Sequence, residues 1–347
     1  MKQHEREYFV AQIRSGVYYI NREELTLKVV SPTFDEHLQA CHVFKEAYQE
    51  AYRKDVMCLD EIYEWMNDHE LWTQEHENQI KAIQKDLERL KVEIFQNNMN
   101  DALCNKIRLY LRAGESQLEE LSKQKLAYFQ NTREGIAEAE KARWLIERCT
   151  FKGDELYDFA ELSPDFVMSC YRDMILSQKE SREIARTEPW KSIWVTHKST
   201  GCSLFANKGD REITEDQKSV ILWASMYDNI QESIDCPTDE VIQDDDMLDG
   251  WFIVQKRKRD KDRAESDFDE GTRSDKIKNA GEVFVVANSE RQKERVQGMN
   301  NVAGKMIIKE REAKLKRSGN TKAGQFRDEQ LEIRSQANTM YKGKFGG

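Results

Sequence analysis

The sequence predicts a mainly α-helical protein with a small N-terminal β-hairpin, an antiparallel helical hairpin, an α-helical globular domain and an extended basic C-terminal tail. Only 4 of its 347 residues are Pro and 16 are Gly, a composition that favours long helices. Apolar residues recur at helical spacing through most of the chain, as in amphipathic helices. The formal charge of −10 is uneven, because residues 291–347 carry 14 Lys and Arg against 6 Asp and Glu, or +8, which leaves −18 on residues 1–290.

The N-terminal segment predicts a β-hairpin. Two runs rich in β-branched and aromatic residues, 17–20 and 25–30, flank the polar residues 21–24, which can form the turn. Pro32 ends the second run, since proline has no N–H to donate to a strand ladder. Residues 7–13 fit either a short helix or a strand.

Helices follow, and the clearest pattern among them is a helical hairpin. We expect helices over residues 35–54 and 59–66 from their apolar stripes. Two later stretches, which Thr73 and Asp101 can cap, have apolar residues at heptad spacing. The seams are Ile80, Ile83, Leu87, Leu90 and Ile94, then Ile107, Leu111, Gly114, Leu118, Leu121 and Tyr128. Joined by a short polar loop, they predict an antiparallel hairpin, with an intermolecular coiled coil as the alternative.

The region after residue 150 predicts a second, α-helical unit. Ser163 followed by Pro164 is typical of a helix start, and Thr214 with Gln217 fits a capping box. A helix over about residues 179–195, or one that begins again at Pro189, lies between them. We therefore expect an N-terminal mixed element plus hairpin at 1–150, an α-helical globular domain at 151–255, and a charged, partly disordered tail at 256–347. Residues 250–254 fit a strand or an anchoring segment at the end of the globular domain.

No catalytic motif appears in the sequence, so we predict a non-enzymatic protein with no cofactor and no metal site. The seven cysteines are scattered without a C-x-x-C pair, which indicates reduced thiols. The chain has no phosphate-binding loop, and its acidic run 228–249 does not place oxygen ligands at the spacing of a calcium loop. One enzymatic alternative remains: the aspartates of residues 244–249 could hold a divalent ion for phosphoryl transfer.

Aromatic residues beside acids form the candidate protein-binding site. Aromatic anchors with a polar rim are typical of interfaces, although burial in a core is the other interpretation of these aromatics. The candidate residues are Trp190, Trp194, Trp223, Tyr227, Asp228, Asp244, Asp245, Asp246, Asp249 and Trp251.

Composition excludes or disfavours several partners. No apolar stretch approaches the length of a membrane span, and the N-terminus has no apolar signal core, so we expect neither a membrane protein nor a secreted one. Nucleic-acid binding by the basic run 256–263 or by the tail is disfavoured, because the acidic body repels phosphate at long range.

Four segments together resemble a group of proteins of large tailed bacteriophages, encoded among the tail genes and similar to tail-assembly chaperones. The segments are residues 182–194, 214–217, 223–229 and 244–253, and the likeness covers roughly residues 150–255. It implies an assembly factor in the host bacterial cytoplasm that binds a tail protein, such as the tape measure or a baseplate component. The alternative is a structural component of the virion tail or neck whose C-terminal tail threads into neighbouring subunits. Homo-oligomer formation is left open.

Overall fold

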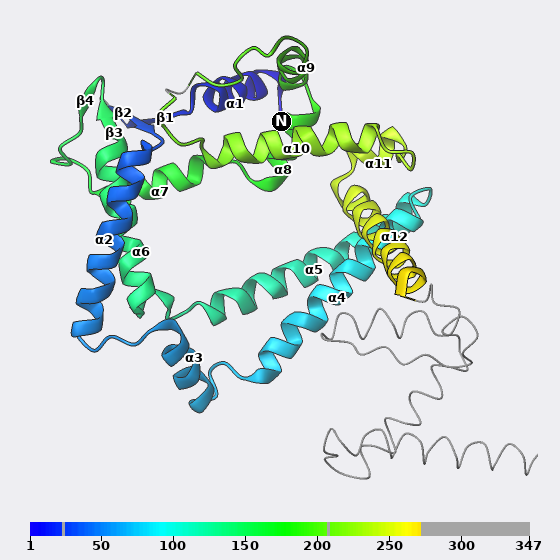
Figure 1. Cartoon of the computed structure of the whole chain (residues 1–347), viewed down its shortest axis with the longest axis horizontal. Helices are drawn as coiled ribbons and strands as arrows, with labels where there is room; N and C mark the ends of the chain where they lie inside the picture. The colour runs from blue at the N-terminus through cyan, green and yellow to red at the C-terminus, as the bar shows by residue number, and fades with distance from the viewer. Residues whose placement is uncertain (23–24, 207–208, 272–347) are drawn as a thin grey trace, which may run out of the picture. The chain divides into compact units, whose positions relative to one another are not determined.

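A computed structural model of the chain describes residues 1–22, 25–206 and 209–271 (Figure 1). Contacts divide the chain into two compact units, Met1–Ile253 and Val254–Gly347. The first unit is mainly helical and carries one small antiparallel sheet. Most of the predicted basic tail, from residue 272 onward, lies outside the described residues.

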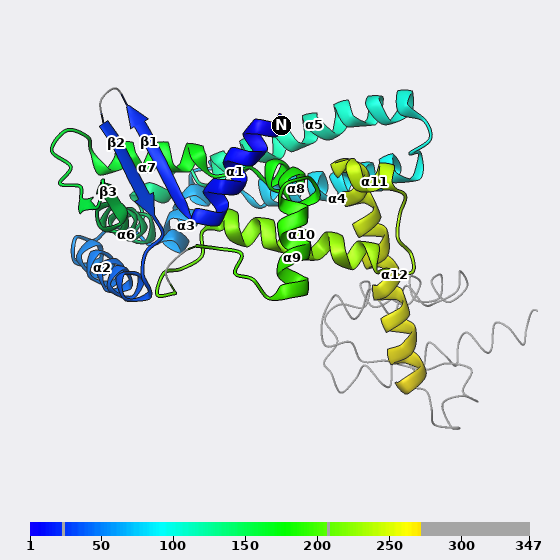
Figure 2. The same cartoon turned by 90° about the horizontal axis from the view of Figure 1, so that it is seen from above.

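The sheet begins with the predicted hairpin. Helix α1 (Gln3–Ser15) precedes β1 (Val17–Arg22), which pairs with β2 (Leu25–Val30), and Figure 2 shows these two strands side by side. Residues 7–13 are therefore helical. Two short strands from far along the chain, β3 (Thr150–Lys152) and β4 (Glu155–Leu156), complete the antiparallel order β1-β2-β3-β4.

The division predicted at residue 150 is not seen, because β3 pairs directly with β2 and lies in the same unit. The core that covers one face of the sheet also contains residues from both sides of position 150. Its core joins β1 and β2 to α6 (Arg133–Cys149) and to α7 (Pro164–Met174). The buried residues of this core are Tyr18, Ile20, Leu27, Val29, Ile146, Tyr157 and Val167.

The two helices expected after the hairpin are confirmed as α2 (Phe34–Arg53) and α3 (Leu59–Asp68). Thr33 caps α2, since its hydroxyl accepts from Glu36 N–H at 3.1 Å while the Glu36 carboxylate accepts from Thr33 N–H at 2.7 Å. Helix α2 packs along α6, which the short 3-10 helix η1 (Phe129–Asn131) precedes. Tertiary contact with α6 therefore holds α2 in place.

The predicted helical hairpin is confirmed as α4 (Gln74–Gln96) and α5 (Asp101–Lys125), which pack against each other. Leu87 and Ile94 of α4 are buried in the same cluster as Ile107 and Leu111 of α5. Helix α4 begins after Thr73, as expected. The cap of α5 is Asn100 and not Asp101, because the Asn100 amide oxygen accepts from Leu103 N–H at 3.1 Å.

Five helices complete the first unit: α8 (Gln178–Arg186), α9 (Trp190–Thr200), α10 (Glu215–Gln231), α11 (Asp239–Gln243) and the start of α12 (Asp245–Gly271). The predicted starts are confirmed, with Ser163 capping α7 and the box of Thr214 and Gln217 capping α10. Residues 250–254 are helical, so the strand, one of the two alternatives for this segment, is wrong. Residues 256–271 are helical where we expected an extended tail. The side chains of Met247, Leu248 and Trp251 are buried in the largest core cluster, so the first turns of α12 pack against the core.

A buried carboxylate joins the sheet to α10. Asp216 lies in the first turn of α10, and its side chain accepts from the Tyr18 hydroxyl at 2.8 Å and from Leu176 N–H at 3.0 Å. Burial raises the pKa of the Asp216 carboxyl above its usual range, and burial also raises the pKa of Tyr18. These two bonds set where α10 begins relative to β1 and to the connection between α7 and α8.

Candidate protein-binding site

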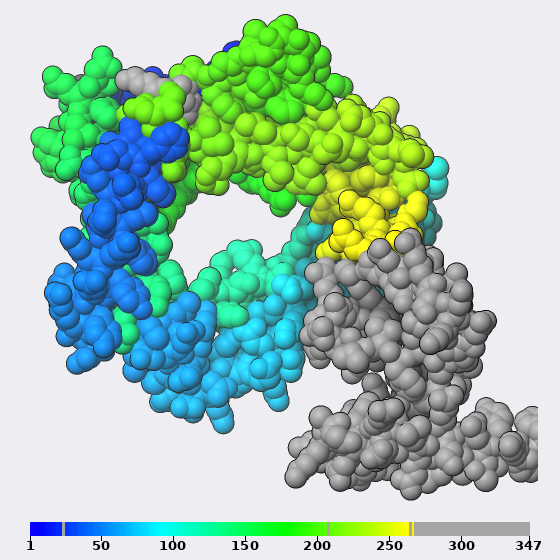
Figure 3. All heavy atoms as spheres, in the orientation of Figure 1, coloured from blue at the N-terminus to red at the C-terminus, as the bar shows by residue number. Residues whose placement is uncertain are grey.

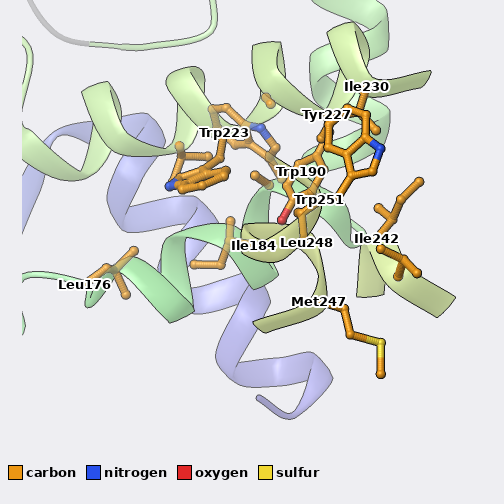
Figure 4. Packing of buried hydrophobic residues seen from close by; sticks show 14 of the residues in the cluster. Leu176, Ile184, Trp190, Trp223, Tyr227, Ile230, Ile242, Met247, Leu248 and Trp251 are labelled. Carbon is orange, nitrogen blue, oxygen red and sulfur yellow. The ribbon is translucent and has the colours of Figure 1, made fainter. Parts of the chain in front are cut away.

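The structure brings the predicted aromatic residues together, but inside the core. Trp190 has no exposed surface, and Trp223, Tyr227 and Trp251 expose only 5%, 6% and 7% of theirs. Figure 4 shows these side chains gathered with Leu248 among α10 and the helices below it. A buried side chain cannot reach a partner without unfolding of its surroundings, so these four aromatics are core residues and not partner anchors.

Trp194 and Asp228 lie at the edge of this core. Trp194 is partly buried and packs against the core, four residues after Trp190 on the same face of α9. Its indole N–H donates to the Asp228 carboxylate at 2.6 Å, and the Lys198 ammonium lies 3.1 Å from the same carboxylate. The Asp228 carboxylate therefore accepts the hydrogen bond of the Trp194 indole and pairs with the Lys198 ammonium, and both of these residues lie on α9.

The predicted aspartates 244–249 are ion-paired with bases from other helices. Asp244 accepts from the Arg108 guanidinium at 2.6 Å, and Asp246 accepts from Arg112 at 2.8 Å. Arg108 lies 3.4 Å from Asp246 as well, so this arginine pairs with both carboxylates while Arg112 pairs with Asp246. The Asp246 side chain is only 11% exposed, so these charges interact in a less polar environment than bulk water.

The other two aspartates pair with α4 and α8. Asp245 accepts from Arg186 at 2.7 Å, and Asp249 accepts from Arg182 and from Lys91, each at 2.7 Å. We call these residues the ion-pair cluster: Lys91, Arg108, Arg112, Arg182, Arg186, Asp244, Asp245, Asp246 and Asp249.

The ion-pair cluster joins the α4–α5 hairpin to α8 and α12. Its bases come from α4, α5 and α8, and its acids come from the residue before α12 and from the first turns of that helix. Asp244 also caps α12, because its carboxylate accepts from the N–H groups of Asp246 and Met247 at 3.1 and 3.0 Å. Figure 3 shows the first turns of α12 meeting α10 and α11. The cluster is therefore a contact between helices far apart in sequence.

A pocket of about 470 Å³ lies over the ion-pair cluster. Its lining residues include six bases and five acids, so their formal charges nearly cancel. They are Lys91, Arg108, Arg112, Glu115, Gln178, Lys179, Arg182, Arg186, Gln243, Asp244, Asp245, Asp246 and Asp249. Guanidinium and ammonium groups lie where the divalent ion of the phosphoryl-transfer hypothesis would have to bind. In the part of the chain that the structure describes, no three His, Cys, Asp or Glu side chains are grouped as metal ligands.

The bases of the cluster were not among the predicted site residues, although the sequence carries a signal for them. Arg108 and Arg112 are four residues apart on α5, as are Arg182 and Arg186 on α8. Like charges at this spacing destabilise an isolated helix by a few tenths of a kcal/mol. Such doubled arginines therefore indicate an acidic partner elsewhere in the fold, here the aspartates of α12.

Gly250 lets α12 approach α4 closely at the cluster. A Cβ atom at this position would lie 2.2 Å from the carbonyl oxygen of Lys91 and 2.7 Å from Phe95 Cβ. Both contacts are well inside van der Waals distance, and the first is with backbone, which cannot rotate away. Gly is therefore required here for the helix crossing.

We expect Gly250→Ala to lower the free energy of unfolding by about 1–3 kcal/mol, since the added methyl group forces α4 and α12 apart. Urea unfolding followed by far-UV circular dichroism measures this change. Gly209→Ala is the matched control, because a Cβ there meets nothing within 4 Å, and it should change stability by no more than about 0.5 kcal/mol. Equal stability of the two variants would contradict the close crossing.

An exposed face of α5 offers apolar surface that the core does not use. Leu109 is 72% exposed and Tyr110 is 59% exposed, and both lie outside the heptad seam that packs against α4. We call this surface the α5 outer face: Met99, Ala102, Lys106, Leu109, Tyr110 and Ala113, all exposed. Lys106 is its one charged residue, in a protein whose composition is 34% charged. None of these residues is among the predicted site residues, because the apolar pattern that the sequence shows on α5 is that of the heptad seam.

Within the described residues, none of the helices is both long and apolar enough to cross a membrane. No protein-family profile, curated protein or solved structure matches this chain.

Proposed function

We propose that this chain is a non-enzymatic, chaperone-like phage tail assembly factor that binds a tail protein, such as the tape measure or a baseplate component, in the host cytoplasm. Support for the phage context is the resemblance of residues 182–194, 214–217, 223–229 and 244–253. The observation that carries the binding role is the α5 outer face, where Leu109 and Tyr110 are exposed.

The chemistry of this face selects a helical partner. Leu109 and Ala113 are four residues apart, and Lys106 and Ala102 continue the same stripe one and two turns earlier. A partner helix with apolar residues at the same spacing can pack along such a stripe. Burial of Leu109 and Tyr110 against it would each contribute about 1.5–3 kcal/mol, and an acidic residue opposite Lys106 would add charge complementarity.

The ion-pair cluster supports this role by holding α5 in place. Arg108 and Arg112 bind the aspartates on one side of the helix, while Leu109 and Tyr110 face away from the hairpin seam. A face fixed before binding loses little conformational entropy when its partner arrives. The predicted site residues therefore contribute to binding indirectly, by positioning α5.

Co-expression with the tape-measure protein tests the proposal. We expect the full chain to raise the soluble fraction of that protein and to co-purify with it, and Leu109→Glu to abolish both effects. Leu222→Glu is the matched control, since Leu222 is 58% exposed on α10 and lies away from the α5 outer face. The same loss in both variants, or no effect of Leu109→Glu on binding, would contradict a role for this face.

Two further measurements separate the alternatives. Mass spectrometry of purified particles should find the chain absent or in trace amounts, whereas stoichiometric retention would contradict the chaperone-like role and favour a structural virion component. Light scattering of the purified chain should give a mass that Leu109→Glu leaves unchanged. A dimer that this substitution dissociates would mean that a second copy occupies the face.

A further inference from the structure

A small pocket of about 230 Å³ lies between the end of α1 and the side of α9. It is lined by Arg14 from the last turn of α1, by residues of α9 and by residues 202–204, which follow that helix. All of these residues are described, and none of them is Asp or Glu. Pockets for drug-sized ligands usually measure about 300–1,000 Å³, so this one is suited to a smaller molecule.

Two basic side chains are held at this pocket by hydrogen bonds with the backbone. The Arg14 Nε–H donates to the Leu204 carbonyl at 3.3 Å. His197 bonds through Nδ1 with the Cys202 carbonyl, and because a carbonyl oxygen only accepts, Nδ1 carries the hydrogen. The segment that provides both carbonyls is itself tied to α1, since Ala206 N–H donates to the Arg14 carbonyl at 2.8 Å. Arg14 and His197 are therefore positioned by the same short segment.

The charges around the pocket favour an anion. Residues 189–206 include two lysines but no acid, although the chain as a whole has 64 Asp and Glu, and one of these lysines, Lys198, pairs with Asp228 of α10. Within the described residues, Arg14 makes no ion pair. A guanidinium has five N–H donors, and the bond to Leu204 uses one of them. The remaining donors of this exposed side chain can bind a negatively charged group.

We infer that this pocket binds a small aliphatic carboxylate, whose head is bound by the Arg14 guanidinium and whose short chain packs against Ile193 and Leu204. The two terminal nitrogens of a planar guanidinium fit a carboxylate, and its one positive charge matches the single charge of that group. Ile193 is only partly buried, so an aliphatic chain over it removes apolar surface from water. The inference does not depend on the proposed role in tail assembly, because the pocket and the α5 outer face share no residue.

Titration of the full chain with acetate, butanoate and butanol, followed by the NMR signal of the Arg14 Nε–H group, tests the inference. We expect butanoate to bind more tightly than acetate, by up to about fourfold for each added methylene, because its longer chain covers more apolar surface. Butanol, which has the same chain without the charge, should bind at least about tenfold more weakly than butanoate. Equal binding of butanol and butanoate, tighter binding of inorganic phosphate than of butanoate, or no saturable binding at about 50 mM butanoate would overturn the inference.

Variants locate the site, with calorimetry as the measurement. Arg14→Met keeps an aliphatic stem and should weaken butanoate binding at least about tenfold, and Arg14→Lys, which keeps the charge, should recover part of the loss. Lys191→Met is the matched control, because Lys191 is exposed on α9 and does not line the pocket, and it should change the affinity by less than about twofold. Equal losses for Arg14→Met and Lys191→Met, or no loss for either, would place the anion elsewhere and refute the assignment. The ligand series uses the unchanged chain, so it decides the question if Arg14→Met does not fold.

Discussion

Replacement of Trp190 by alanine is expected to lower the free energy of unfolding by about 3–5 kcal/mol, the usual cost of deleting a large aromatic side chain from a core. Trp190 has no exposed surface and packs in the largest cluster of buried residues, with Phe205 stacked beside it. The cavity left behind is bordered by several helices and cannot collapse without moving them. Urea unfolding should show a lower midpoint with an unchanged slope.

Trp194→Ala is the matched comparison on the same helix. Trp194 packs only partly against the core, so its removal should cost clearly less than that of Trp190, although it loses the hydrogen bond to Asp228. A loss at Trp190 no larger than that at Trp194 would show that Trp190 is not a core residue. In that case the original interpretation of these tryptophans as partner anchors would again be open.

Arg182→Met is expected to lower the free energy of unfolding by about 1.5–3 kcal/mol, the usual contribution of a hydrogen bond between charged groups, because Asp249 loses Arg182 and keeps only Lys91 as its counter-charge. The Arg182 side chain is 8% exposed, donates to Asp249 at 2.7 Å and places its guanidinium 4.0 Å from the Trp223 ring. Methionine keeps the aliphatic stem, so the loss reports the charge. The measurement is urea unfolding at low and at high salt, and burial should leave the loss nearly independent of salt.

Two controls separate the buried pair from surface charge. Arg89→Met removes an exposed pair with Asp86, whose side chains are 71% and 63% exposed, and should change stability by about 0.5 kcal/mol or less. Combining Arg182→Met with Asp249→Leu should cost less stability than the sum of the two single losses, since the two side chains interact with each other. Additive losses in the double variant, or equal losses for Arg89 and Arg182, would contradict a stabilising contact between Arg182 and Asp249.

Much of the secondary structure could be predicted because its signals lie within a few residues. The starts of α7 and α10 follow from Ser163 with Pro164 and from Thr214 with Gln217, and these caps form with the expected geometry. The hairpin of α4 and α5 follows from heptad spacing in the same way. The strand β3 could not be found, because its three residues pair with a strand about 120 positions earlier and carry no local pattern.

The candidate site was predicted in part. Its aromatic residues and aspartates do come together in space, but with the aromatics inside and the acids paired. An apolar stripe on a helix shows that one face will be buried, yet it does not show against what, and the same stripe serves a core or an interface. The sequence also could not indicate which bases pair with the aspartates of residues 244–249. Their partners Lys91, Arg108 and Arg182 are each more than 60 residues away along the chain.

The sequence by itself determined the mainly helical class, the caps, the hairpin seam and the separation of a −18 body from a +8 tail, since each of these depends on composition or on neighbours along the chain. Only the tertiary structure decided that Trp190, Trp223, Tyr227 and Trp251 form a core, that the aspartates of α12 hold the hairpin, and that Leu109 and Tyr110 remain exposed. Burial and charge pairing are set by which distant helices meet, and that contact cannot be read from local spacing.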